Sequence, residues 1–248
     1  KGDAMVSGGN TGAVLVGSTM YVKRIRGIRR AALAPILPTD KGGALLIDCG
    51  ANVECTPEYL LQFAYMGSFY CQKQMKIASP RIGLINNGAE ESKGTPMIKE
   101  THGLLKQARE AGRLNFVGNI EGRDVPFGMA DVILCDGFTG NVLLKTYEGV
   151  GLYFVGELKK IFFKNLGTKL AALLVKKGLG ALKKKMDYKE VGGAPLLGIC
   201  KPVIKAHGSS DAYAIKNAVR QAKQFASSGI IESITDNVDV MRLETTQL

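Results

Sequence analysis

Histidine is scarce in this chain, and its cysteines lack metal-binding spacing. Two histidines and five cysteines occur among the 248 residues, with no Cys-x-x-Cys pair. These counts argue against a zinc site and against a disulfide framework, and they fit a reducing compartment. The sequence therefore predicts a cytoplasmic protein that has no metal site.

Long apolar runs and nucleotide-binding signatures are also missing. No apolar run reaches the roughly 18 residues that a membrane-spanning helix needs. Neither the Gly-x-x-x-x-Gly-Lys-Ser/Thr loop nor the Gly-x-Gly-x-x-Gly dinucleotide fingerprint occurs. We therefore expect neither a nucleotide nor a nicotinamide cofactor.

Glycine, by contrast, is plentiful and follows strand-like runs. Four such runs end in turns of Gly with Asn, Asp, Thr or Ser, at residues 7–12, 48–52, 86–94 and 136–141. In parallel α/β sheets, ligands bind at the carboxyl ends of the strands, where free backbone N–H groups attract anions. One such turn is common between a strand and a helix and needs no function, but four in one chain favour an anion or phosphate site.

Strand and helix patterns alternate up to about residue 151. Strands are expected at 3–6, 44–48, 81–86, 114–118 and 131–135, and helices at 10–24, 57–74, 95–111 and 140–164. The alternation predicts an α/β/α sandwich with a mostly parallel sheet and helices on both faces. After residue 193 the pattern returns, with a strand at 202–204 and a helix over 211–228. We expect one α/β domain over residues 1–248.

A lysine- and leucine-rich segment over 157–188 interrupts this pattern. Its stretch from Leu158 to Met186 holds nine lysines and no Asp, Glu or Arg, and so carries +9, while the net charge of the chain is +11. Nucleic-acid binding would call for arginines and spaced aromatic residues, and a solvated lysine face is the ordinary alternative. We favour a helical tip that lies on an anionic membrane surface, with the apolar stripe Leu166, Leu170, Leu173 and Leu174.

The turn at 136–141 is a candidate cradle for phosphate or for a developing oxyanion. It offers Asp136, Gly137, Thr139, Gly140 and Asn141 at a probable helix entrance. The alternative is simple helix capping by Thr139 or Asn141.

Two further candidates carry positive charge or a proton. Lys93 precedes Gly94 and follows Asn87 in a loop, so it could hold a phosphate or simply face solvent. His207 lies with Gly208 and Ser209 between a strand and a helix, where it could donate to an oxyanion. The alternative is a structural turn with Ser209 or Ser210 as N-cap, and His102 has a structural setting inside a helix.

In order, these motifs resemble the bacterial phosphate acyltransferases of phospholipid synthesis, the PlsX family. The matching stretches are Ser7-Gly-Gly-Asn-Thr-Gly-Ala13, Arg30-Ala-Ala-Leu-Ala-Pro-Ile-Leu-Pro-Thr39, Asp48-Cys-Gly-Ala-Asn52, Asp136-Gly-Phe-Thr-Gly-Asn141 and Ile204-Lys-Ala-His-Gly-Ser-Ser-Asp211. The family begins with a further segment containing Asp-Ala-Met-Gly-Gly-Asp, which this chain lacks. The resemblance implies that part of the first domain is missing.

The resemblance also implies a function. Inorganic phosphate would attack the thioester of an acyl carrier protein and give an acyl phosphate, in a fold like isocitrate and isopropylmalate dehydrogenases. The protein would be a homodimer on the inner face of the cell membrane, with no cofactor and no nucleic-acid partner. Lys93, Asn141 and His207 would be catalytic. Substrate or phosphate would be bound by Ser7, Asn10, Thr11, Asn52, Asn87, Gly94, Asp136, Gly137, Thr139, Gly140, Gly208 and Ser209.

Two alternatives remain open. One is acetyl or butyryl transfer between phosphate and coenzyme A, which uses the same chemistry without a membrane tip. The other is a membrane-docking scaffold that has lost catalysis. The sequence does not decide which loop holds the phosphate and which the thioester.

Overall fold

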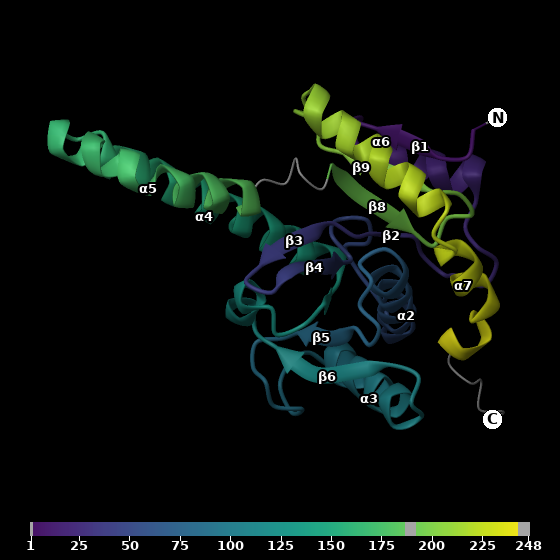
Figure 1. Cartoon of the computed structure of the whole chain (residues 1–248). Helices are drawn as coiled ribbons and strands as arrows, with labels where there is room; N and C mark the ends of the chain where they lie inside the picture. The colour runs from purple at the N-terminus through teal and green to yellow at the C-terminus, as the bar shows by residue number, and fades with distance from the viewer. Residues whose placement is uncertain (1, 187–191, 243–248) are drawn as a thin grey trace.

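Two β-sheets organise the chain, and the larger one is the expected parallel sheet. A computed structural model describes residues 2–186 and 192–242, which Figure 1 shows. The larger sheet has the order β3-β4-β7-β5-β6, with bounds Ile36–Thr39, Gly42–Ile47, Val132–Leu134, Arg81–Ile85 and Asn115–Ile120. β4, β7, β5 and β6 run parallel, and β3 is antiparallel to β4. The turns that follow β4, β7 and β5 therefore leave at one edge of the sheet.

The helices on one face of this sheet begin where the sequence predicts. α2 (Pro57–Lys73) and α3 (Pro96–Glu110) each have Pro at the first helical position after a Thr cap. The hydroxyls of Thr56 and Thr95 each accept the backbone N–H three residues further on. This cap satisfies one of the four N–H groups that a helix start leaves without a partner.

Alternate side chains of the central strands face opposite sides of the sheet. Leu45 and Ile47 of β4 are fully buried in the core that α2 and α3 cover. Leu46 points the other way and packs with Leu143 at the start of α4 (Gly137–Phe162). Burying one such leucine or isoleucine side chain stabilises the fold by about 1.5–3 kcal/mol. Because alternate residues of β4 are apolar on both sides, α4 covers the face of the sheet opposite to α2 and α3.

The smaller sheet corrects the expectation of a single parallel sheet for residues 1–151. Its order is β1-β9-β8-β2, with bounds Met5–Ser7, Val203–Ala206, Gly193–Leu197 and Ala32–Leu33. β1 runs parallel to β9, whereas β9 with β8 and β8 with β2 are antiparallel pairs. The first predicted strand is thus real, but its partner comes from the far end of the sequence.

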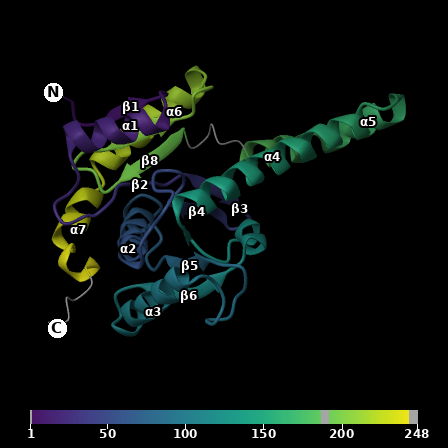
Figure 2. The same cartoon turned by 180° about the vertical axis from the view of Figure 1, so that it is seen from behind.

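Helices cover both faces of this smaller sheet. α6 (Ala212–Ala226) lies in front of it in Figure 1, and α1 (Thr11–Gly17) lies in front in Figure 2, seen from behind. α1 continues as the π-helical turn η1 (Ser18–Val22), so the helix expected over 10–24 ends two residues early. α7 (Ile230–Asp236) follows α6 and packs against α2, which ties the smaller sheet to the larger domain core.

A long helical arm carries the lysine-rich segment away from both sheets. The second half of α4 and α5 (Leu166–Met186) form the arm that projects in Figures 1 and 2. The four predicted stripe leucines are exposed, with Leu174 at 88% and Leu166 at 81%. The expected tip at 157–188 consists of the end of α4 and the whole of α5, joined by a turn at 163–165, and its last two residues lie outside the described part. None of the described helices is both long and apolar enough to cross a membrane.

Candidate active site

Four segments from distant parts of the sequence meet where the two sheets adjoin. The turns after β1 and β9 lie together, since a Cβ built on Gly8 would be 3.7 Å from the His207 carbonyl oxygen. The turn after β4 lies against the start of α4, where the Gly137 N–H donates to the Asn52 carbonyl oxygen at 2.8 Å. Three of the four predicted Gly-rich turns are therefore brought together with the His207 turn.

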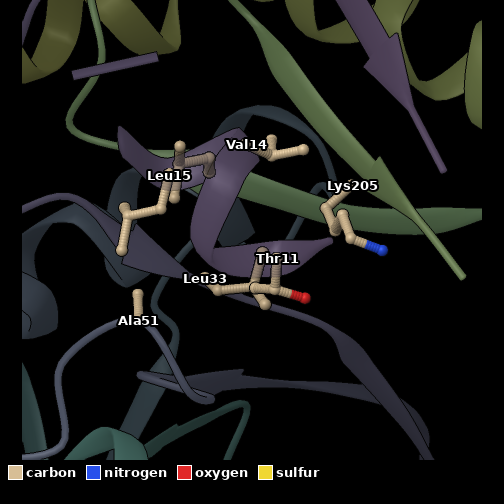
Figure 3. A pocket seen from close by; sticks show the side chains of 7 residues that line it. Thr11, Val14, Leu15, Leu33, Ala51 and Lys205 are labelled. Carbon is tan, nitrogen blue, oxygen red and sulfur yellow. The ribbon is translucent and has the colours of Figure 1, made fainter. Parts of the chain in front are cut away.

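A small cavity links these two pairs of turns, as Figure 3 shows. It is lined by Thr11, Val14, Leu15, Leu33, Ala51, Leu196 and Lys205. Its volume is about 10 Å³, which is room for about one water molecule. The cavity is thus too small for a substrate, and its polar groups, the Thr11 hydroxyl and the Lys205 ammonium group, lie on one side of it in Figure 3.

Asp48, a residue absent from the predicted site, organises the turn after β4. Its side chain is fully buried and accepts hydrogen bonds at 2.6–3.1 Å from the backbone N–H groups of Leu33, Cys49, Ala51 and Asn52 and from the Asn52 amide. Burial raises the pKa of Asp48 above its ordinary value, against these hydrogen bonds, which lower it. Because Leu33 belongs to β2, this one carboxylate joins the smaller sheet to the larger.

The start of α4 differs from the capping that the sequence predicts. The N-cap is Asp136, whose carboxylate accepts the Thr139 N–H at 2.8 Å and the Thr139 hydroxyl at 2.7 Å. Capping by Thr139 or Asn141 is therefore wrong, because the helix begins at Gly137. Both predicted cap residues lie inside the first turns of α4.

The glycines of this turn are required by close packing. A Cβ on Gly137 would lie 2.5 Å from the Asn52 carbonyl oxygen and 2.6 Å from Asp48 Oδ2. A Cβ on Gly140 would overlap the Asp48 carbonyl oxygen. Only hydrogen fits at either position, so glycine lets the start of α4 lie directly on the turn at 48–52.

Two of the four predicted asparagines, Asn52 and Asn141, differ in their contacts. Asn52 donates its amide to the Ala31 carbonyl oxygen at 2.8 Å and to Asp48 at 3.1 Å, so its amide group holds the turn. Asn141 is exposed, and its Oδ1 lies 3.7 Å from a Cβ built on Gly50. Of the two, Asn141 has its side chain on the surface of the site, where a substrate can reach it.

His207 is exposed at the end of β9. Its Nδ1 accepts the Ser209 N–H at 3.2 Å and lies 2.7 Å from the Ser209 hydroxyl. A neutral ring with Nδ1 as acceptor carries its proton on Nε2. The expected N-cap, Ser209 or Ser210, is wrong, since Asp211 caps α6. The turn therefore presents His207 as a donor.

The first predicted turn mainly satisfies its own backbone. The Ser7 hydroxyl accepts the Gly9 N–H at 3.2 Å, and Asn10 caps α1 by accepting the Ala13 N–H at 3.2 Å. These contacts hold Thr11 at the rim of the cavity.

The Lys93 loop leaves the same sheet edge but makes separate contacts. β5 and β7 are parallel neighbours, so the turns of Lys93 and Asn141 share an edge, as predicted. The Asn86 amide donates to the Lys93 carbonyl oxygen at 3.1 Å, and a Cβ on Gly94 would be 2.7 Å from Asn86 Oδ1. Lys93 and Asn87 are exposed. In the part of the chain that the structure describes, the hydrogen bonds of this loop stay within it or reach α3 and β6.

Buried His102 of α3 holds the Lys93 loop in place through Asn119 and Glu91. His102 Nδ1 lies 3.0 Å from Asn119 Oδ1, and the Asn119 amide donates to the Glu90 carbonyl oxygen at 2.9 Å. His102 Nε2 lies 3.5 Å from Glu91. These contacts agree with the structural role predicted for His102.

Thiols near the site are not activated. Burial, together with the negative charge of Asp48, raises the pKa of both Cys49 and Cys55 to about 12. Both side chains are therefore protonated thiols at neutral pH, and neither supplies the thiolate that nucleophilic catalysis needs.

Comparison with known proteins decides the family. Residues 1–233 match the family described as fatty acid synthesis protein. The chain belongs to this family.

Curated members of this acyltransferase family are identical to this chain at about half of the aligned residues. The phosphate acyltransferase of Alkaliphilus oremlandii is 52% identical over 238 residues, which cover 96% of this chain and 70% of the relative. That of Oceanobacillus iheyensis is 50% identical over 240 residues, with coverage of 96% and 71%. The predicted class, a phosphate acyltransferase of fatty acid and phospholipid synthesis, is confirmed at the level of the family.

Solved structures confirm the α/β fold. A phosphotransacetylase from Staphylococcus aureus has a TM-score of 0.55 and 15% identity, covering 93% of this chain and 63% of that chain. One from Streptococcus pyogenes has a TM-score of 0.55 and 18% identity, with coverage of 94% and 62%. The acyltransferase chain thus spans less than two thirds of these structures.

Proposed function

We propose that this family member transfers a fatty acyl group from the thioester of an acyl carrier protein to inorganic phosphate. The observation that carries the proposal is that three Gly-rich turns meet His207 and Lys205 where the two sheets adjoin. Phosphate is already partly dianionic at neutral pH, and a thiolate is a good leaving group. The reaction therefore needs positioning and charge stabilisation more than a strong base.

The chemistry fits the groups that are present. A phosphate oxygen attacks the thioester carbonyl carbon, the carbon–sulfur bond breaks, and the sulfur leaves on the carrier and takes up a proton. The products are an acyl phosphate and a free carrier thiol. His207 Nε2 and the Asn141 amide are the donors we assign to the thioester oxygen as it becomes negative. No covalent enzyme intermediate is required, which agrees with the protonated Cys49 and Cys55.

The test is release of free carrier thiol when the protein is mixed with long-chain acyl carrier protein and phosphate. We expect thiol release that depends on phosphate and is absent when chloride replaces it. Release from acetyl- or butyryl-coenzyme A alone would instead support the small-acyl transferase. No release from any thioester would leave the non-catalytic scaffold.

We also propose that α5 holds the protein on the inner face of the cell membrane. Leu170 and Leu174 are 62% and 88% exposed, and lysines border the same helix. An exposed apolar stripe flanked by lysines suits an anionic lipid surface, at about 1 kcal/mol for each lysine near it. An acidic carrier protein would be attracted by the same charge, but it would not need the leucines.

Changing Leu170 and Leu174 to Glu separates these explanations. The double variant keeps the lysines, so binding to vesicles of anionic phospholipid should be lost while turnover of soluble acyl carrier protein survives. Val219→Glu is the matched control, because Val219 is 54% exposed on α6 and lies off the arm. Lost turnover with intact vesicle binding would show that the arm docks the carrier protein.

A homodimer is the third part of the proposal. Leu152, Tyr153 and Phe154 of α4 are 76%, 65% and 59% exposed, and a second copy could cover them. Leu152→Glu should then lower the molar mass measured by light scattering from that of a dimer to that of a monomer. An unchanged mass would place the dimer contact elsewhere or exclude it.

A further inference from the structure

Lys205 lies at the meeting point of the segments that build the candidate site. It is the residue of β9 that lines the cavity with Thr11 of α1 and Ala51 of the 48–52 turn. Figure 3 shows its ammonium group on the same side as the Thr11 hydroxyl. The side chain is half-buried, unlike the exposed Lys93 that the sequence favours.

Lys205 is also short of partners. Its ammonium group donates to the Ala206 carbonyl oxygen, which leaves two of its three donors for other groups. No carboxylate pairs with it among residues 2–186 and 192–242. A half-buried cation beside a hydroxyl and without a counter-charge is arranged to receive an anion.

A second lysine lies close enough to act on it. Lys145, two turns into α4, already pairs with Glu148 at 2.8 Å. Burial, and then the charge of Lys145, lowers the pKa of Lys205 below its ordinary value. Lys145 also acts on Cys49 in the 48–52 turn. A nearby positive charge makes the ammonium form of Lys205 less stable, and a bound anion would offset this effect.

We propose that Lys205 is the principal ligand of the phosphate substrate, assisted by the Thr11 hydroxyl and by the more distant charge of Lys145. This inference rests on the proposed function and assigns the phosphate to the β9 side of the site. The thioester oxygen then lies toward His207 and Asn141. Because the cavity has room for only about one water molecule, the phosphate would lie outside it against the Lys205 ammonium group and reach the carbonyl carbon from the β9 side.

Differential labelling tests binding without turnover. Acetic anhydride at pH 8 should acetylate Lys205, and inorganic phosphate should protect it in a saturable manner, as measured by mass spectrometry. Lys201 is the control, because it is exposed in the turn before β9 and should react equally with and without phosphate. Equal labelling of Lys205 in both conditions would overturn the proposal.

Kinetics of variants give the second measurement. Lys205→Met should raise the KM for phosphate about 10- to 100-fold, as expected for loss of a charged hydrogen bond. It should change the KM for the acyl carrier thioester little. Lys205→Arg should recover part of the phosphate affinity, Lys145→Met should have a smaller effect, and Lys201→Met should have none. An unchanged phosphate KM in Lys205→Met would refute the assignment.

The two failures can be told apart. If the wild-type protein releases no thiol but phosphate still protects Lys205, the anion site stands and the proposed reaction fails. If thiol is released and Lys205 is neither protected nor needed for phosphate affinity, the reaction stands and the assignment of Lys205 fails.

Discussion

Replacing Gly137 by Ala tests whether the site depends on the contact between α4 and the turn at 48–52. The new Cβ would lie 2.5 Å from the Asn52 carbonyl oxygen and 2.6 Å from Asp48 Oδ2. Carbon and oxygen normally stay about 3.3 Å apart, so helix and turn must separate by about 0.8 Å. Asp48 cannot move freely, because its carboxylate holds four backbone N–H groups. We expect a loss of about 1–3 kcal/mol in the free energy of unfolding.

Gly149→Ala is the matched control in the same helix. A Cβ on Gly149 meets nothing within 4 Å, so helix propensity alone should stabilise this variant by about 0.5–1 kcal/mol. Urea unfolding followed by circular dichroism measures both variants. Turnover of Gly137→Ala should also fall, since a displacement of about 1 Å can cost about 100-fold in rate. Equal stabilities for the two variants would refute the packing argument.

Three further predictions concern single side chains. Burial raises the pKa of Asp131, but hydrogen bonds from Arg81 outweigh it and hold that pKa below its ordinary value. This stabilisation is present above about pH 4 and is lost as the pH falls through the folded-state pKa, so the stability measured by urea unfolding between about pH 5 and pH 2 should fall less in Asp131→Asn than in the wild-type protein. His207→Ala should slow turnover about 100- to 1000-fold, and near-normal turnover would make His207 structural. Lys93→Ala should lower kcat/KM with the fold intact, and unchanged kinetics would remove Lys93 from the site.

The elements of the larger sheet follow from local sequence. Thr56 with Pro57 marks the start of α2. Leu45, Leu46 and Ile47 are all apolar, which indicates a strand that is buried on both faces of the sheet. Both signals act within a few residues, so they are readable without tertiary structure. In the smaller sheet only β1 and β9 carry such a signal, at the predicted 3–6 and 202–204, whereas β2 is two residues long and β8 contains Pro195. Its strands are set by long-range pairing.

The site was only partly predictable for the same reason. Gly-rich turns identified the segments, but the roles within them depend on packing. Gly137 and Gly140 are expected at a helix entrance and do form the first turn of α4, but nothing local shows that this turn lies on Asp48. Asp48 itself carried a usable signal, an Asp followed by Gly and Asn after a buried strand. Lys205 gave none, since its position depends on β9 meeting α1.

The parallel pairing of β1 with β9 has a consequence for synthesis of the protein. Met5 pairs with Val203, so the residues up to Val203 must leave the ribosome before β1 finds its partner in the sheet. The larger sheet, by contrast, draws on residues that emerge earlier and can fold first. Closing so long a loop is slow. The Lys205 and His207 side of the site therefore forms after the larger sheet, and the nascent chain cannot bind substrate there until β9 has emerged.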